Sequence, residues 1–205
     1  ELDEMISYLE SYETLGLVRF RNLVLTGGFH LLKLDFREHR DKILAAASEI
    51  FSILGISDSD FTRLTHGQKR EVLSRAFEAP TVNFYTLFGN VTHDTASIAE
   101  AFLKIAWAKE TIGEESIDSF IVSMTQEPTD MLAVLWFAKQ TGLWIPGKKA
   151  NLSITPLFET IDVLESGTQF LEELRTDSLY SLYLRDRKST QEIMIGYSDS
   201  SKDGG

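Results

Sequence analysis

The 205-residue sequence contains no cysteine, which excludes disulfides, thiolate zinc sites and cysteine nucleophiles. Its 31 acidic residues outnumber 20 basic ones, giving a net charge of -11, and no basic cluster is longer than Arg185-Asp-Arg187-Lys188. Proteins that bind a phosphate backbone need a positive surface, so nucleic acid is not an expected partner. The longest apolar-rich stretch, Met131 to Ala138, is far shorter than a membrane span. No membrane association is therefore predicted either.

The amino terminus has neither the basic nor the apolar region of a secretory signal, so the cytoplasm is the predicted location. Apolar residues make up 43% of the chain, which is enough to bury a core. No tract rich in proline or serine divides the sequence. We therefore predict one continuous unit over residues 1–205.

Short apolar strands alternate with amphipathic helices along the chain. The apolar spacing predicts a first helix that ends near Gly16. Four strands are predicted, at residues 29–36, 120–124, 152–158 and 192–197. The other predicted helices cover residues 43–54, 67–77, 95–111, 128–142 and 161–174, the last with an interruption at Gly167. Strands separated by helices pair in parallel, so the fold class is α/β.

Two architectures fit this order, namely a doubly wound sheet and a TIM-like (β/α)8 barrel. Three of the four predicted strands end in charged residues, at Arg37, Glu159 and Asp199. Functional residues from several strand ends are typical of a barrel. A doubly wound dinucleotide-binding sheet would have a Gly-x-Gly-x-x-Gly turn after its first strand, and the sequence has none. We predict a helix-rich part of a (β/α)8 barrel with parallel strands.

Four segments resemble consecutive blocks of bacterial-type phosphoenolpyruvate carboxylase, and they occur in that family's order. They are Phe29-His-Leu-Leu-Lys-Leu-Asp-Phe-Arg-Glu38, Ile121-Val-Ser-Met-Thr125 with Asp130, Pro156-Leu-Phe-Glu-Thr160, and Ile193-Met-Ile-Gly-Tyr-Ser-Asp-Ser-Ser-Lys-Asp-Gly-Gly205. The resemblance extends from about Leu23 onward. It implies a piece of the barrel of a large cytoplasmic lyase.

The resemblance also implies a chemistry of carbon dioxide fixation that feeds the tricarboxylic acid cycle. Phosphoenolpyruvate and bicarbonate become oxaloacetate and phosphate, with magnesium (Mg2+) or manganese (Mn2+) as the cofactor. Bicarbonate attacks the phosphoryl group to give carboxyphosphate and the enolate of pyruvate, and the enolate carbon then captures the released CO2. The complete enzyme is expected to be a homo-oligomer, specifically a tetramer.

By the same resemblance, Glu159 and Asp199 are the expected metal ligands, and hard cations do prefer carboxylate oxygens. Arg37 and Lys202 are the expected catalytic and substrate-binding cations, with Arg37 holding a phosphate or carboxylate through its planar fork. Each residue has a simpler interpretation. Glu159 can be an acid in the first turn of a helix, Asp199 a solvated turn residue, and Arg37 the partner of an acid on its own strand.

Other features have structural interpretations. Asp130 is predicted to cap or solvate a helix start without a catalytic role, and Leu132, Leu135 and Trp136 are predicted core residues. Lys202 lacks the preceding glycines and following hydroxyl of a nucleotide-binding P-loop, so that interpretation is rejected.

The family's catalytic histidine lies in a Thr-Ala-His-Pro-Thr segment, and none of the four histidines here has that context. The family's loop rich in glycine and arginine is also absent. We therefore expect a fragment of a longer enzyme that is inactive by itself. The alternatives are another barrel enzyme that uses phosphoenolpyruvate or pyruvate, and a non-catalytic scaffold domain that binds a partner through its acidic surface. Retained metal binding would argue against the scaffold.

Overall fold

The structure is a computed structural model that describes residue 4, residues 15–28 and residues 32–196. Its centre is a four-stranded sheet in the order β1-β2-β5-β6. These strands are β1 (Leu34–His39), β2 (Ile117–Ser123), β5 (Ser153–Phe158) and β6 (Met194–Ile195), and a separate antiparallel pair is formed by β3 (Trp144–Ile145) and β4 (Lys149–Ala150). The helices are α2 (Leu15–Gly27), α3 (Arg40–Ile53), α4 (His66–Glu78), α5 (His93–Thr111), α6 (Pro128–Gln140), α7 (Ile161–Glu165), α8 (Gly167–Thr176) and α9 (Ser178–Asp186).

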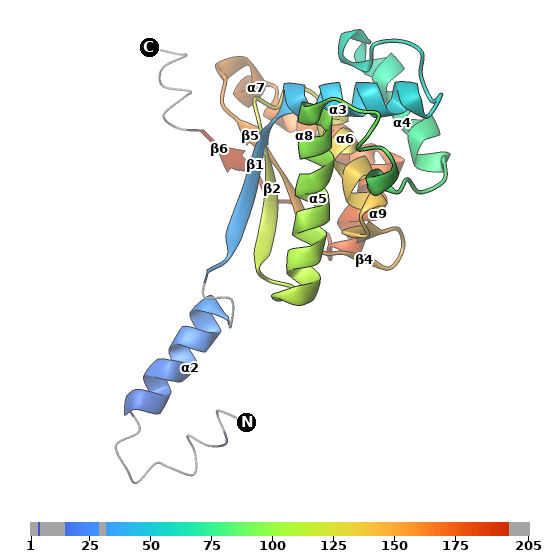
Figure 1. Cartoon of the computed structure of the whole chain (residues 1–205). Helices are drawn as coiled ribbons and strands as arrows, with labels where there is room; N and C mark the ends of the chain where they lie inside the picture. Colours follow the sequence, from blue (N-terminus) through green and yellow to red (C-terminus); the bar gives the residue numbers. More distant parts are fainter. Residues whose placement is uncertain (1–3, 5–14, 29–31, 197–205) are drawn as a thin grey trace.

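The strands of the main sheet are neighbours in chain order, and every pair is parallel. Figure 1 shows helices α3, α5, α6, α8 and α9 on one side of this sheet, whereas α2 lies apart from it. Helical crossovers between parallel strands account for this layer of helices. The predicted α/β class with parallel strands is confirmed.

A row of phenylalanine rings joins the sheet to the helix layer. Phe36 of β1 stacks on Phe120 of β2 with 5.1 Å between the ring centroids. Phe120 stacks on Phe102 of α5 at 4.7 Å, and Phe102 on Phe137 of α6 at 5.1 Å. The last three rings are fully buried. Such stacking adds about 0.5–1.5 kcal/mol per pair to the hydrophobic contribution of burial. The core also holds the predicted residues Leu132, Leu135 and Trp136, which confirms their interpretation.

The opposite face of the sheet is more polar, because side chains alternate along each strand. On this face Ser119 of β2 is paired with Ser153 of β5, Thr155 lies two residues further along β5, and both Ser119 and Thr155 are buried. Their hydroxyls donate hydrogen bonds to the carboxylate of Glu192, just before β6. Burial opposes ionisation of Glu192, but these hydrogen bonds prevail and lower its pKa. Glu192 thereby ties the approach to β6 to the centre of the sheet.

Most of the predicted helices are confirmed to within a few residues. They appear as α3, α4, α5 and α6, and Gly167 marks the start of α8 after α7, as predicted. Gly55 and Gly142 follow α3 and α6 with φ of +65° and +74°. This left-handed conformation ends helices and is open to glycine at little cost.

The predictions near the amino terminus were partly wrong. The helix expected to end near Gly16 falls mainly on residues 5–14, which lie outside the described residues. Helix α2 (Leu15–Gly27) was not predicted. Strand β1 ends at His39 instead of residue 36, because pairing with β2 extends to Ser123. Helix α9 and the β3–β4 pair were not predicted.

Candidate functional site

The carboxyl ends of parallel strands meet at one edge of a sheet, and ligands commonly bind there. Arg37 lies in β1 near this edge, and Glu159 directly follows β5. Asp199 and Lys202 fall after β6, outside the residues that the structure describes. The structure therefore shows the placement of two of the four predicted site residues.

Arg37 and Glu159 form an ion pair at this edge. The Nη2 atom of Arg37 lies 2.6 Å from Oε1 of Glu159. Strand β2 runs between β1 and β5, and neighbouring strands are about 4.8 Å apart, so the long arginine side chain reaches over one strand. Arg37 thus contacts an acid on a different strand. The alternative partner on its own strand, Glu38, lies 3.2 Å from Lys42 Nζ.

Glu159 is buried, with a side chain only 6% exposed, whereas the Arg37 side chain is 52% exposed. Its other oxygen, Oε2, accepts a hydrogen bond of 2.7 Å from the backbone N–H of Met124. Both oxygens are therefore in contact with donors, which a buried carboxylate requires. Helix α7 begins at Ile161 with Thr160 as its N-cap, so Glu159 precedes the helix. Its burial does not fit an acid in the first helical turn.

A second charged pair lies beside the first, where β2 leads into α6. Arg40 holds Asp130 through two hydrogen bonds of 2.9 Å, from Nε and Nη2. Asp130 is 1% exposed and also accepts from the backbone N–H groups of Gln126 and Glu127, at 2.9 and 3.1 Å. The interpretation of Asp130 as a helix cap is confirmed. Its partner Arg40 had no sequence signal, because 90 positions separate the two residues.

Glu127 extends this network to α4. Its carboxylate pairs with Lys69, which is 6% exposed, and lies 3.3 Å from Nδ1 of His66 and 3.6 Å from Arg40. Burial opposes ionisation of Glu127, but the hydrogen bond and charge of Lys69, helped by His66 and Arg40, outweigh it and lower the pKa. Glu127 thus anchors the turn beside Glu159 to α4.

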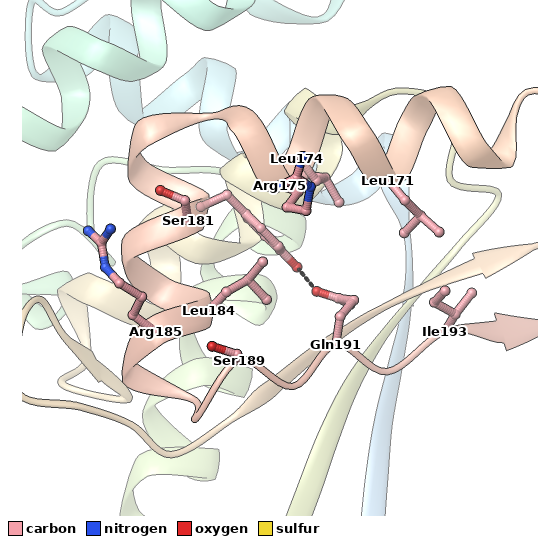
Figure 2. A pocket seen from close by; sticks show the side chains of 10 residues that line it. Leu171, Leu174, Arg175, Ser181, Leu184, Arg185, Ser189, Gln191 and Ile193 are labelled. Carbon is pink, nitrogen blue, oxygen red and sulfur yellow. Dashed lines mark hydrogen bonds between the residues drawn. The ribbon is translucent and has the colours of Figure 1, made fainter.

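An apolar pocket of about 450 Å³ lies elsewhere, between α8, α9 and the segment that leads to β6. Figure 2 shows Leu171 and Leu174 from α8 facing Leu184 and Ile193 across it. A hydrogen bond of 2.9 Å from the Tyr180 hydroxyl to Gln191 crosses its floor. None of the described residues that line this pocket carries a carboxylate. The pocket lies in the helix layer, whereas the buried carboxylate of Glu159 lies at the strand ends. We therefore place the candidate site at the strand ends.

The donor chemistry at the strand ends suits a hard divalent cation. Among residues 4, 15–28 and 32–196, no group of three or more histidine and acidic side chains is placed to hold a metal. Mg2+ is often bound by one or two carboxylates, with water and substrate completing its shell. Glu159 provides one buried carboxylate, and Asp199 is the predicted second. In the same part of the chain, no helix combines the length and apolar character needed to cross a membrane.

Fold and site together define a class: an α/β protein of parallel strands that pairs a buried carboxylate with an accessible guanidinium at the carboxyl edge. The family model of phosphoenolpyruvate carboxylase matches residues 9–205. The chain therefore belongs to the phosphoenolpyruvate carboxylase family.

Curated relatives agree with this assignment. The phosphoenolpyruvate carboxylase of Roseiflexus castenholzii is 36% identical over 178 residues, which cover 87% of this chain and 19% of the relative. That of Corynebacterium diphtheriae is 34% identical over 195 residues, which cover 92% of this chain and 21% of the relative. That of Rhodothermus marinus is 33% identical over 199 residues, with the same coverage of both chains. The chain thus spans about a fifth of the length of these relatives.

Proposed function

We propose that this chain forms part of the barrel of a phosphoenolpyruvate carboxylase and contributes to its metal and phosphoenolpyruvate sites. One observation carries the proposal: in a chain matched by the family over residues 9–205, the buried carboxylate of Glu159 lies against Arg37 at the carboxyl ends of the strands. The complete lyase would convert phosphoenolpyruvate and bicarbonate to oxaloacetate and phosphate.

The sheet supports a barrel. Its strands follow chain order without a reversal, and the helices in contact with it lie on one side, as Figure 1 shows. A doubly wound sheet has helices on both faces and a point where strand order reverses. A section of barrel wall has an outer helix layer and an inner face that carries functional residues at the carboxyl end. In this proposal residues 1–205 form one continuous unit of that wall.

The proposed roles follow from charge and donor geometry. Glu159 and Asp199 would hold Mg2+ or Mn2+, which supplies positive charge for the enolate and phosphate oxygens. Arg37 binds a phosphate or carboxylate oxygen of phosphoenolpyruvate through its planar fork, because the exposed half of its side chain leaves donors accessible. Lys202 adds a second positive charge.

The reaction moves negative charge between oxygens. A bicarbonate oxygen attacks phosphorus, the bond from phosphorus to the enolate oxygen breaks, and carboxyphosphate and pyruvate enolate result. Carboxyphosphate then gives CO2 and phosphate, and the enolate carbon forms the new carbon–carbon bond. Fixed cations at the strand ends stabilise the developing enolate and phosphate charge without reorganising.

The remaining parts of the proposal concern the complete protein. We propose a cytoplasmic homo-oligomer, a tetramer, that contributes oxaloacetate to the tricarboxylic acid cycle and has no nucleic-acid partner. The acidic net charge of -11 supports the last point. A non-catalytic scaffold, or another barrel enzyme that uses phosphoenolpyruvate or pyruvate, is the competing function. Metal binding separates the scaffold from the enzymes, and the product separates the two enzymes.

The first prediction concerns Glu159→Gln and Asp199→Asn in the full-length protein. Each amide keeps the shape of the side chain but removes an anionic oxygen, so we expect Mn2+ affinity to fall by about tenfold or more and turnover to fall with it. Arg37→Lys keeps the charge and loses the fork, so it should raise the KM for phosphoenolpyruvate while metal dependence changes little. Mn2+ titration and a coupled oxaloacetate assay measure both effects.

Matched controls use exposed residues away from the edge. Glu110→Gln on α5 and Arg63→Lys, after α3, make the same chemical changes at exposed positions and should leave both measurements as in wild type. If Glu159→Gln and Asp199→Asn bind Mn2+ like wild type, neither residue is a ligand and the proposed site is wrong.

A further inference from the structure

We propose that Met124 and Gly196 are positioning residues that fix the direction of the Glu159 carboxylate, each from the end of a neighbouring strand. The inference rests on the proposed function of Glu159 as a metal ligand. Gly196 has no side chain, and the soft thioether of Met124 is not a ligand that a hard cation such as Mg2+ prefers. Both act through backbone geometry around Glu159.

Met124 acts through its N–H group. It follows β2 with φ of 55°, in the left-handed region that residues with a side chain rarely adopt. In this conformation its N–H points to Oε2 of Glu159 at 2.7 Å. A left-handed residue other than glycine is maintained only where the surrounding structure determines it, and such residues cluster at functional sites.

The turn that holds Met124 is fixed on its far side. The Thr125 hydroxyl donates to the Val122 carbonyl at 2.7 Å, and the next two N–H groups donate to Asp130. Asp130 is in turn held by both hydrogen bonds from Arg40. The charged network of the β2–α6 turn thereby determines where the Met124 N–H points.

Gly196 acts through the absence of a side chain. Its N–H donates to the Phe158 carbonyl at 2.9 Å, which draws the end of β6 against the residue before Glu159. A Cβ atom added to Gly196 would lie 3.0 Å from Cγ of Glu159 and 3.5 Å from its Cα. The 3.0 Å contact is tighter than most Cβ contacts in proteins, so the Glu159 side chain would have to shift by a few tenths of an ångström to accept a larger residue.

The carboxylate is therefore confined from two sides, by a hydrogen bond from the β2 end and by close packing from the β6 end. Its Oε1 atom meets Arg37 on the third side. A binding group must be held to within about 0.5 Å of its productive position, and a shift of a few tenths of an ångström caused by a Cβ atom at position 196 uses up much of that tolerance. Partners that orient a ligand typically contribute 10- to 100-fold to metal affinity.

The test measures Mn2+ affinity and thermal unfolding of the full-length protein. Gly196→Ala should lower Mn2+ affinity by roughly tenfold, and Gly196→Val by more, because the larger side chain displaces Glu159 further. Met124→Gly keeps the N–H and relieves the left-handed backbone, so its affinity should stay within about twofold of wild type. Met124→Val disfavours that backbone and should weaken Mn2+ binding severalfold.

Gly67→Ala is the matched control, since a Cβ atom at Gly67 in α4 meets nothing within 4 Å. It should bind Mn2+ like wild type. A role through Glu159 also requires that Gly196→Ala has no further effect in a Glu159→Gln background, because the two changes remove the same contribution. A merely structural role would lower the unfolding temperature and leave affinity of the folded protein unchanged.

The outcomes separate this inference from the proposed function. If Glu159→Gln retains wild-type Mn2+ affinity, the assignment of the ligand itself fails. If Glu159→Gln loses affinity while Gly196→Ala and Met124→Val do not, the metal ligand stands and the positioning roles are wrong. The same conclusion follows if Gly196→Ala weakens binding equally in both backgrounds.

Discussion

At the scale of residues, three charged side chains with little exposure in the described structure each lie against an opposite charge. Asp130, Glu127 and Lys69 have little exposure, and each contacts at least one group of opposite charge. Desolvation of an isolated charge costs several kcal/mol, and removal of one partner leaves the other charge uncompensated. The network therefore fixes the β2–α6 turn more firmly than exposed ion pairs do, which contribute about 0–1 kcal/mol.

Glu127→Gln should consequently destabilise the protein in a pH-dependent way. The pKa of Glu127 is lowered in the folded state, so its contribution is present above the unfolded pKa of about 4.3 and is lost as pH falls through the lower folded pKa. We expect a loss of roughly 2 kcal/mol at pH 7. Below the folded pKa the protonated wild-type side chain resembles glutamine, so the difference should shrink.

Urea unfolding of both proteins between pH 7 and pH 3 measures this difference in unfolding free energy. Glu110→Gln, an exposed change, should stay within about 0.5 kcal/mol of wild type throughout. A difference for Glu127→Gln that is constant with pH would show that packing, rather than charge, explains the loss.

At the scale of elements, local signals predicted much of the helix layer. Helix α6 begins with Pro128 and is followed by Gly142, and both positions were read from residue type alone. The signal for α9 was overlooked: Asp177 caps it, and the buried Tyr180 and Tyr183 recur at helical spacing. Strand β6 is shorter within the described residues than its apolar pattern predicted, since only Met194 and Ile195 pair with β5.

The candidate site was predictable only in part, because several of its contacts depend on strand order and tertiary packing. Arg37 and Glu159 were predicted from the family resemblance, with support from the charged residues at strand ends, which share one edge of a parallel sheet. Their direct ion pair across β2 depends on strand order, which the sequence pattern leaves open. The contribution of Met124 depends on its backbone N–H and φ, and residue type does not encode these. Lys69 and Glu127 meet only through tertiary packing, 58 positions apart.

Gly142→Ala tests whether the end of α6 needs a left-handed residue. The φ of +74° is strained for alanine, so we expect a loss of about 1 kcal/mol in unfolding free energy. A Cβ atom there meets nothing within 4 Å, so a steric clash would not explain the loss. Gly67→Ala, in ordinary helical backbone, should be neutral or stabilising by up to about 1 kcal/mol. Equal effects of the two changes in urea unfolding would contradict the backbone argument.

At the scale of the whole molecule, apolar surface remains exposed in the described structure. Leu23 and Leu25 of α2 are 69% and 67% exposed, and Leu34 of β1 is 58% exposed. Within the described residues, β1 and β6 are the edges of the main sheet, each with one neighbouring strand. Exposed strand edges and apolar patches favour association with another surface. Helix α2 lies apart from the sheet in Figure 1, and its exposed Leu23 and Leu25 are available for such an association.

We therefore expect the 205-residue chain, studied by itself, to self-associate through α2 and the edge at β1. Leu23→Glu combined with Leu25→Glu places charge on the exposed side chains of α2, so it should shift the protein toward monomer at micromolar concentration. Sedimentation velocity across a concentration series measures the change. Tyr85→Glu is the control, because Tyr85 is 69% exposed but lies in the turn between α4 and α5. A monomer at every concentration for wild type would reject the prediction, and equal effects of both variants would place the contact elsewhere.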